Sequence, residues 1–395
     1  MNHKKKVLFV NGNLHVGGIE RSLIDLLTHL DYSRYEVDLF LIEEKGELVG
    51  ELPSNVHLIC ADLYKTYGSF ISVIKNNLFN GELKLVITKI IIILSHLFGN
   101  KALRLLCLLY NVGKKYDCAI AYRVGFSLEV VSYGIHSKKK YCWWHNGLCN
   151  YNPEEINTIQ RAWNDFDAII AVSKGCRQMI LSSFPKLLPE RVKVIPNMVD
   201  IDRINTLAGS ESPYSNDDST LTIITVGRLC WEKHIEDIPQ IASELIKQGV
   251  RQLKWYIVGE GDMRERIEEE IRSYSVEDYV YLLGTQPNPY PYIKYADMMV
   301  HTSHVESQGL TILEAMALRT SCVAVASMGP REYLNDSNGI LTGQSIDSLV
   351  EGVIDMIHKV SDEEIVENAY NSVVRNFSPI IIVSLFEKLL NVNIC

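Results

Sequence analysis

The sequence predicts an α/β protein built from two doubly wound, Rossmann-like domains that face one another across a cleft. Strand-like apolar runs alternate with helical patterns twice along the chain. These runs are almost continuously apolar, which is typical of parallel strands buried on both faces. The chain has 395 residues, and a single hydrophobic core usually stops growing below that length.

The predicted strands follow in order. In the first half, apolar runs predict strands at residues 7–11, 37–42, 56–61, 118–123, 140–145, 168–173 and 192–196. In the second half, they predict strands at residues 221–227, 254–259, 279–284, 298–303, 322–327 and 339–343. Between the halves lies GSESPYSNDDST (209–220), a polar segment rich in turn residues, which we expect to be a loop.

The composition limits the class of protein. The 47% hydrophobic and 22% charged content is ordinary for a globular chain. Nine cysteines without a Cys-x-x-Cys pair, and no recognisable secretory signal, predict reduced thiols in the cytosol. The longest apolar stretch, residues 85–98, is interrupted by Lys89 and His96 and is shorter than the roughly 20 residues of a membrane span.

Charge is divided unevenly between the two expected domains, 1–197 and 198–377. Residues 1–197 carry 24 Lys and Arg against 18 Asp and Glu, whereas the rest of the chain carries 15 against 30. The acid-free segment 83–116 contains six basic residues. On a helix, Lys84, Thr88/Lys89 and Ser95/His96 would form one stripe, so the segment is a candidate for contact with an anionic membrane surface. The alternative is a packed helical hairpin with solvated lysines, and the two interpretations are compatible.

The most informative string is HTSHVESQGLTILEAMA (301–317). It passes from a predicted strand through a turn at Gly309 into a helical pattern, and it carries Glu306 and Glu314. The carboxyl edge of an open α/β sheet is where ligands bind, and the free amides at a helix N-terminus suit a phosphate. A Glu pair at this spacing arises easily by chance, whereas the whole string does not.

Two cations are predicted at the same sheet edge. In TVGRLCWEKHIEDI, Arg228 follows a predicted strand and Lys233 precedes a predicted helix. A guanidinium and an ammonium group can neutralise a diphosphate whose charge rises as its bond to a sugar breaks. Arg228 or Lys233 alone would be better explained as a solvated loop residue than as a diphosphate ligand. The hypothesis of a diphosphate site therefore depends on their convergence with Glu306.

A second glycine-containing turn follows the first strand. Gly17 and Gly18 directly precede a helical pattern, where a backbone can approach a ligand closely. The spacing does not match the dinucleotide fingerprint, and Gly259 and Gly261 do not complete one either. Taken alone, Gly17 and Gly18 more often indicate a tight strand-to-helix turn than a site.

The ordered set of motifs resembles the retaining, nucleotide-sugar-dependent glycosyltransferases of family 4, which have the GT-B fold. The resemblance runs over nearly the whole chain, and its last motif is HVESQGLTILEAMA (304–317). The earlier motifs are Gly17-Gly18 with Glu20, WWHNG with His145, AVSKG with Ser173, VIPNMVD, VGRLCWEKH and VGEG. The resemblance implies an acceptor-binding first domain, to which a final helix at about 378–395 returns, and a second domain that binds the donor.

The resemblance also assigns roles. Arg228 and Lys233 would hold the diphosphate, Glu314 would bind the ribose hydroxyls, and Glu306 and His145 would lie beside the donor sugar. The remaining expected contacts to the donor are Gly17 and Gly18 from the first domain and Gly284, Thr285, Ser307, Gly309 and Leu310 from the second. No metal and no cofactor is implied, because the two cations supply the charge of a divalent ion.

Two positions depart from the family pattern. Gln308 replaces the usual aromatic residue, and Asn146 follows His145 where an aspartate is frequent. His145 therefore needs another orienting group, and a buried histidine is often structural.

The predicted function is retaining transfer of a sugar from a UDP-sugar to a saccharide acceptor. A lipid-diphosphate-saccharide acceptor in cell-surface polysaccharide or capsule assembly fits the basic first half, with a cytoplasmic enzyme at the inner face of the membrane. The alternatives are a nucleotide-sugar 2-epimerase, a glycan phosphorylase, or a catalytically silent binding homologue. Nucleic acid is not an expected partner, because the pI is 5.7 and the basic run lacks stacking aromatics.

Overall fold

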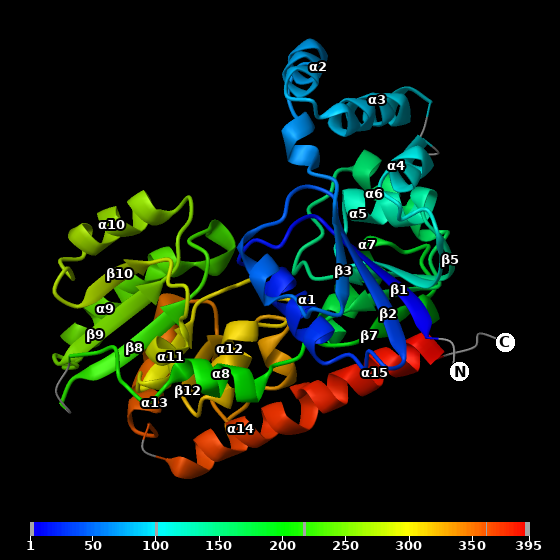
Figure 1. Cartoon of the computed structure of the whole chain (residues 1–395). Helices are drawn as coiled ribbons and strands as arrows, with labels where there is room; N and C mark the ends of the chain where they lie inside the picture. Colours follow the sequence, from blue (N-terminus) through cyan, green and yellow to red (C-terminus); the bar gives the residue numbers. More distant parts are fainter. Residues whose placement is uncertain (1–3, 99–101, 216–218, 361, 392–395) are drawn as a thin grey trace. The chain divides into compact units, whose positions relative to one another are not determined.

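The computed structural model describes residues 4–98, 102–215, 219–360 and 362–391 (Figure 1). The chain divides into two compact units. Unit 1 comprises Met1–Ile195 with Val383–Cys395, and unit 2 comprises Pro196–Ile382. The chain leaves unit 1 after Ile195, which is two residues before the predicted boundary at 197. It returns to unit 1 at Val383, inside the last helix.

The described part of unit 1 contains a seven-stranded parallel sheet in the order β3-β2-β1-β4-β5-β6-β7. Its strands are β1 (Lys5–Asn11), β2 (Tyr35–Leu41), β3 (Val56–Cys60), β4 (Lys115–Ala121), β5 (His136–Trp144), β6 (Ala168–Ala171) and β7 (Val192–Val194). Each predicted strand of the first half overlaps one of them. The order reverses between β1 and β4, which is the switch point of a Rossmann-like sheet.

The described part of unit 1 also contains helices. They are α1 (Gly18–Thr28), α2 (Phe70–Phe79), α3 (Leu83–Phe98), α4 (Leu103–Leu109), α5 (Phe126–Glu129), α6 (Pro153–Trp163), α7 (Lys174–Ser183) and α15 (Pro379–Asn391), with short turns at Glu47–Glu51, Leu63–Thr66, Val130–Gly134 and Pro189–Arg191. Helix α6 begins with a capping box, in which Asn152 accepts from the Glu155 amide and Glu155 accepts from the Asn152 amide.

Helix α15 is anchored to the unit 1 sheet by its second half. The ring of Phe386 stacks on Phe9 of β1 at a centroid distance of 5.9 Å. Tyr141 of β5 donates to the Leu389 carbonyl at 3.0 Å, and Arg34 pairs with Glu387 at 2.8 Å. Burying one large aromatic side chain contributes roughly 1.5–3 kcal/mol, so Phe386 is the main anchor of this returning segment.

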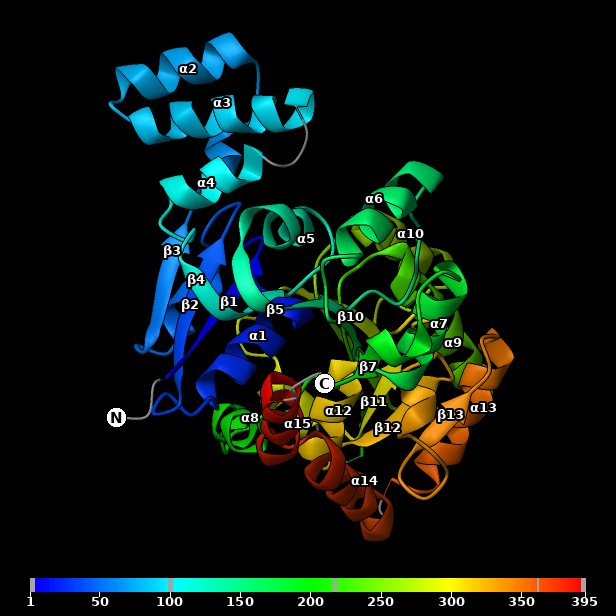
Figure 2. The ribbon, with the colours of Figure 1, turned by 90° about the vertical axis from the view of Figure 1, so that its right-hand side faces the viewer.

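Helices α2 and α3 form a hairpin outside the layer of helices that covers the sheet (Figures 1 and 2). Contrary to the expected basic stripe, part of the polar stripe of α3 points inward. Thr88 is fully buried and shares a 2.9 Å hydrogen bond with Tyr110, and Ser95 is buried as well. The side chain of His96 lies outside the described residues. The described side chains of the hairpin that are large, apolar and exposed are Ile71, Leu78, Phe79, Leu83, Ile87, Ile90 and Leu97.

The described part of unit 2 contains a six-stranded parallel sheet in the order β10-β9-β8-β11-β12-β13. Its strands are β8 (Leu221–Val226), β9 (Leu253–Val258), β10 (Val280–Gly284), β11 (Met298–His301), β12 (Ser321–Val325) and β13 (Ile340–Thr342). All six were predicted from their apolar runs. The switch point lies between β8 and β11.

Neighbouring residues along these strands pack into two different cores. Ile224, Met299 and Cys322 join α8 (Ile201–Ala208), α11 (Tyr290–Lys294), α12 (Leu310–Ala317) and α14 (Glu363–Phe377). The adjacent Ile223, Met298 and Val323 join α9 (Ile238–Lys247), α10 (Arg264–Ser273) and α13 (Ile346–Ile357). Because side chains alternate across a strand, the sheet is covered on both faces, as the continuous apolar runs predict.

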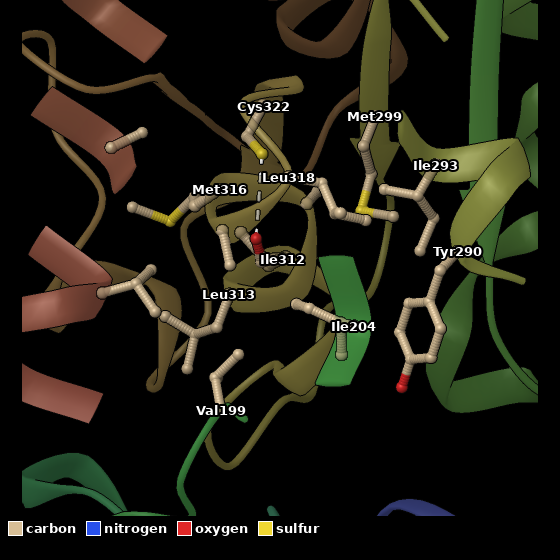
Figure 3. Close-up of a cluster of buried hydrophobic side chains, with 14 of the residues drawn as sticks. Val199, Ile204, Tyr290, Ile293, Met299, Ile312, Leu313, Met316, Leu318 and Cys322 are labelled. Atoms are coloured by element: carbon tan, nitrogen blue, oxygen red, sulfur yellow. Dashed lines mark hydrogen bonds between the residues drawn. The ribbon is translucent and has the colours of Figure 1, made fainter. Parts of the chain in front are cut away.

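Helix α12 lies at the centre of the first of these cores (Figure 3). Its Ile312, Leu313 and Met316 are fully buried, and the Cys322 thiol of β12 donates to the Ile312 carbonyl at 3.9 Å. Packing therefore fixes the axis of α12, and with it the position of the loop that precedes the helix.

The described cysteines are eight free thiols, five of them buried. Among the described residues, no helix is long and apolar enough to span a membrane.

Candidate functional site in unit 2

The candidate site forms where β8 and β11 end, on the two sides of the unit 2 switch point. After β8 the chain carries Arg228 and then a short turn, Trp231–Lys233. After β11 it carries Glu306 in the loop that leads to α12. Because the two parallel strands are neighbours, their following loops meet at the carboxyl edge of the sheet, where such sheets bind ligands.

Lys233 and Glu306 are in direct contact. The Lys233 Nζ donates to Glu306 Oε2 in a short charge-assisted hydrogen bond. His301, the last residue of β11, places its Nε2 at 3.5 Å from the same oxygen. The sequence predicted that Lys233 and Glu306 converge, but nothing in it indicated His301 as a third member.

Burial and charge act in opposite directions on Glu306. Burial alone would raise the pKa of the Glu306 carboxyl, but the Lys233 charge and the His301 hydrogen bond hold this pKa well below its ordinary value. Burial lowers the pKa of His301, so its imidazole is neutral near pH 7. A neutral ring with its proton on Nε2 donates to Glu306, and the carboxylate stays ionised.

Hydrogen bonds also tie the two loops together through their backbones. The Thr302 hydroxyl donates to the Lys233 carbonyl at 2.7 Å, and the Ser303 hydroxyl donates to the Glu232 carbonyl at 2.9 Å. Thr302 and Ser303 are both buried. The backbone that carries Lys233 is therefore held at a fixed distance from the backbone that carries Glu306.

The loop from Glu306 to Gly309 is held on several sides. The Gly329 amide donates to the Glu306 carbonyl at 3.0 Å, and the Tyr333 hydroxyl donates to the Gln308 carbonyl at 2.8 Å. The Gln308 side chain pairs with both backbone groups of Asn197, accepting at 2.8 Å and donating at 2.9 Å. This clamp explains why glutamine replaces the aromatic residue of the family pattern.

Gly309 has a structural requirement for glycine. Its φ is +84°, in the left-handed region, and a Cβ there would lie 2.8 Å from the Tyr333 hydroxyl and 3.3 Å from Glu306 Cγ. The residue forms the N-cap of α12. The first amides of a helix have no intrahelical acceptor. The amides of Gly309 and Leu310, which come after Ser307 in the loop, are therefore suited to an anion.

Glu314 lies one turn further along α12. It accepts a hydrogen bond from the Tyr290 hydroxyl at 3.0 Å, and Arg203 donates to the same hydroxyl at 3.1 Å. The sequence singled out Glu314 as a ribose ligand but did not indicate Tyr290 or Arg203. Both come from helices, α11 and α8, whose packing beside α12 is decided by the core.

Arg228 and the loops after β9 and β10 complete this edge. Arg228 is exposed and forms no ion pair with any residue in the described part of the chain. A Cβ at Gly259, whose φ is +150°, would lie 1.8 Å from the Gly227 carbonyl oxygen, so this glycine lets the β8 and β9 loops pack together. The Gly259 amide donates to the Gly284 carbonyl at 2.9 Å, and Thr285 is exposed beside it.

The other predicted residues belong to unit 1. Gly17 is the N-cap of α1 and Gly18 is its first residue. A Cβ on Gly17 would lie 2.6 Å from the Glu20 carboxylate, so the glycine here accommodates a packed glutamate.

His145 follows β5 directly. Its ring lies 5.0 Å from the ring of Tyr122, and neither ring nitrogen has a hydrogen-bond partner among the described residues. Burial lowers the pKa of His145 to about 3, so the imidazole is neutral. No carboxylate among the described residues orients it, which agrees with the substitution of the usual aspartate by Asn146.

Two Asp-x-Asp sequences occur in the chain, at 165–167 and 200–202. Asp165 accepts from the Ser132 hydroxyl at 2.7 Å, and Asp167 accepts from the Lys140 amide at 2.8 Å. Asp200 caps α8 by accepting from the Arg203 amide at 3.1 Å. These three aspartates therefore have structural partners in the folded chain.

Two Rossmann-like units with parallel sheets, one carrying a lysine–glutamate pair at its switch point, define the chain as a GT-B protein. Residues 211–372 match the family model described as "Glycosyl transferases group 1". In a fold comparison, the protein HepE of Anabaena, in complex with UDP and glucose, superposes with a TM-score of 0.71 at 20% identity. That match covers 98% of this chain and 99% of the HepE chain.

Two curated relatives are similar over part of their length. The poly(ribitol-phosphate) alpha-N-acetylglucosaminyltransferase of Staphylococcus aureus is 25% identical over 245 residues, 61% of this chain and 46% of that protein. The N-acetylgalactosamine-N,N'-diacetylbacillosaminyl-diphospho-undecaprenol 4-alpha-N-acetylgalactosaminyltransferase of Campylobacter jejuni is 26% identical over 173 residues, 43% of this chain and 44% of that protein. The chain thus spans less than half the length of these relatives.

Proposed function

We propose that the protein is a retaining glycosyltransferase that moves a sugar from a UDP-sugar to a saccharide acceptor. The observation that carries this proposal is the partly buried Lys233–Glu306 pair at the unit 2 switch point, next to the amides that open α12. The match of residues 211–372 to the glycosyltransferase family model supports transfer chemistry, and UDP in the HepE complex supports a uridine nucleotide.

In the proposed reaction, the bond from the anomeric carbon to the diphosphate oxygen breaks, and its electron pair leaves with UDP. The acceptor hydroxyl forms the new bond on the same face of the sugar and gives its proton to the departing phosphate. Arg228 and Lys233 stabilise the negative charge that develops on the diphosphate. Glu306 stabilises the positive charge that develops on the sugar, and Glu314 binds the ribose.

The contact between Lys233 and Glu306 matters for this reaction. A diphosphate competes with Glu306 for the ammonium group of Lys233, so donor binding converts an internal ion pair into two contacts with the substrate. The neutral His301 keeps a hydrogen bond to the carboxylate during this exchange, which limits the cost of leaving Glu306 without its lysine.

The proposed reaction uses no metal and no cofactor. The exposed Arg228, which forms no ion pair among the described residues, and the lysine of the partly buried pair together supply two positive charges. This is the charge that Mg²⁺ supplies to diphosphates in other enzymes.

The proposed acceptor is a lipid-linked saccharide diphosphate of cell-surface polysaccharide or capsule synthesis. The poly(ribitol-phosphate) and diphospho-undecaprenol acceptors in the names of the two relatives support this class. We place the enzyme in the cytoplasm, at the inner face of the membrane.

The α2–α3 hairpin supports a peripheral membrane contact, although by a different surface from the predicted basic stripe. Phe79 is 93% exposed, Ile71 77% and Leu97 69%, and further large apolar side chains of residues 64–108 are exposed beside them. A soluble domain rarely exposes so many apolar side chains together without a binding role. The nearby lysines, including Lys75, would lie at the level of anionic headgroups.

A 2-epimerase, a glycan phosphorylase and a silent homologue are the alternatives. The test is nucleotide release from a panel of UDP- and GDP-sugars without acceptor, with Glu306→Ala and Arg228→Ala as comparisons. Slow hydrolysis of one UDP-sugar that disappears in both variants supports the transferase. Release only with free phosphate indicates a phosphorylase, and a new UDP-sugar without release indicates an epimerase. If no donor is turned over or stabilises the fold, with or without a lipid acceptor, the protein is a silent homologue.

A further inference from the structure

A second cluster of side chains lies beside Lys233 and Glu306. His234 follows Lys233 directly, and His304 precedes Glu306 by two residues. The rings of His234 and His304 lie nearly parallel, with centroids 3.6 Å apart. Asp237 places its Oδ2 at 3.3 Å from His234 Nδ1. One ligand atom of each side chain lies within 4.8 Å of the other two.

We propose that His234, Asp237 and His304 bind one divalent transition-metal ion of the zinc class. Two imidazoles and a carboxylate are a ligand set for Zn²⁺ or its neighbours, and a water completes four-fold coordination. Hard cations such as Mg²⁺ prefer oxygen ligands and do not fit this set.

The distances are close to those of a coordinated ion. Zn²⁺ binds nitrogen and oxygen at about 2.0–2.1 Å, so adjacent ligand atoms of a tetrahedral site lie roughly 3.3 Å apart. The pair formed by His234 and Asp237 already has this spacing. Stacked rings cannot direct both lone pairs at one point, so metal binding requires a rotation of the His304 ring.

An unsatisfied nitrogen supports the assignment. His304 Nε2 is buried and has no hydrogen-bond partner in the part of the chain that the structure describes. Most buried polar atoms have a partner, and the exceptions call for an explanation such as an ion. Although this one nitrogen is buried, His234, Asp237 and His304 are each partly exposed. An ion can therefore reach them from solvent.

The position of the cluster gives the ion a structural role. His234 and Asp237 belong to the segment after β8, whereas His304 belongs to the loop after β11. These are the two loops that Thr302 and Ser303 already join by hydrogen bonds. A bound ion would cross-link them further. This inference does not depend on the proposed transfer chemistry, which uses no metal.

The test is metal binding by the full chain without a polyhistidine tag, after removal of metals with a chelator. We expect calorimetry to show one equivalent of bound Zn²⁺ and no binding of Mg²⁺. Co²⁺, titrated in the same way, should show the strong visible absorption of a four-coordinate site. We expect His304→Ala and Asp237→Asn to weaken Zn²⁺ binding at least tenfold.

A third variant and a control separate the site from general effects. His234 has a φ of +48°, and asparagine tolerates this conformation well, so His234→Asn removes the imidazole and leaves the turn intact. The control is His15→Ala, because His15 contacts two carboxylates, Glu44 and Glu47, at 2.6 and 2.8 Å. His15→Ala should bind Zn²⁺ like the wild type. The proposal is wrong if the wild type binds no Zn²⁺, if the site variants bind normally, or if His15→Ala alone loses binding.

Discussion

The amide side chain of Gln308 pairs with both backbone groups of Asn197, 111 residues away in sequence. Gln308 is 3% exposed and Asn197 8% exposed. Asn197 lies at the start of unit 2, immediately after Pro196, and Gln308 lies between Glu306 and Gly309. The segment that enters unit 2 is therefore fastened directly to the loop that carries the candidate site.

Gln308→Ala should destabilise the protein. The substitution leaves a backbone N–H and C=O of Asn197 buried without partners, which costs about 1–3 kcal/mol per group before relaxation. Urea unfolding at pH 7 measures the change. The exposed Gln252 offers a matched control, and Gln252→Ala should change stability by less than about 0.5 kcal/mol. Equal unfolding midpoints for Gln308→Ala and the control would show that the clamp contributes nothing.

Lys233→Met should destabilise the protein by about 3 kcal/mol at pH 7, because it leaves a partly buried carboxylate without its cation. The pKa of Glu306 is lowered in the folded state from an ordinary value of 4.5. The pair therefore stabilises the protein fully above pH 4.5, and this contribution is lost as pH falls below that value. The destabilisation should shrink at lower pH. Unfolding free energies between pH 7 and 3.5 measure this.

The double variant Lys233→Met with Glu306→Gln is the control for that experiment. It removes the uncompensated charge, so it should be more stable at pH 7 than Lys233→Met alone. A destabilisation that is independent of pH, or that the second substitution does not reduce, contradicts an ion pair in solution.

His145 should remain neutral well below pH 6.5. Burial lowers its pKa to about 3, so the unfolded chain binds this proton first as pH falls, and stability is lost from pH 6.5 downwards. Between pH 7 and 5 this accounts for about 2 kcal/mol, at 1.36 kcal/mol per pH unit below 6.5. His145→Phe should lose that part of the pH dependence. Ring resonances of His145 that titrate near pH 6.5 would refute the prediction.

Arg228→Ala should leave stability unchanged to within about 0.5 kcal/mol, because the side chain is exposed. It should lower donor turnover on the order of 10²-fold, the effect of removing one preorganised positive group from a developing charge. Thermal unfolding and nucleotide release are measured on the same preparation. Arg331→Ala, a second exposed arginine of unit 2, is the control and should change neither. Unaltered turnover in Arg228→Ala would remove the residue from the site.

The α2–α3 hairpin should bind vesicles that contain anionic lipid. Phe79→Ser and Ile71→Ser each remove an exposed apolar side chain and should reduce co-sedimentation several-fold, with little effect on stability. Leu188→Ser, which changes a 56% exposed leucine outside the hairpin, should have no effect. If the wild type fails to bind at low salt, or if Leu188→Ser weakens binding equally, the hairpin is not a membrane contact.

The sequence was sufficient for the order and type of the main elements. Runs such as residues 322–326 are apolar on both faces, and only a sheet covered by helices on both sides can bury them. The glycine at 309 and the alternation of strands and helices then place Glu306 and Glu314 at the ligand-binding edge. These inferences rely on local periodicity and on the topology of parallel sheets, and both can be predicted from the order of residues in the chain.

The partners of the site residues were decided by tertiary structure. From the sequence, His301 is only part of a predicted strand, and Gln308 is only a departure from a family pattern. Their partners, Glu306 and Asn197, lie 5 and 111 residues away on other segments. Thr88 looked like part of a solvated stripe, yet Tyr110, which follows α4, satisfies its hydroxyl. The sequence alone determined the two parallel sheets and the edge where the site lies. Only the packing of distant segments decided which polar side chains are paired and buried, because hydrogen bonds across loops depend on positions that local patterns do not encode.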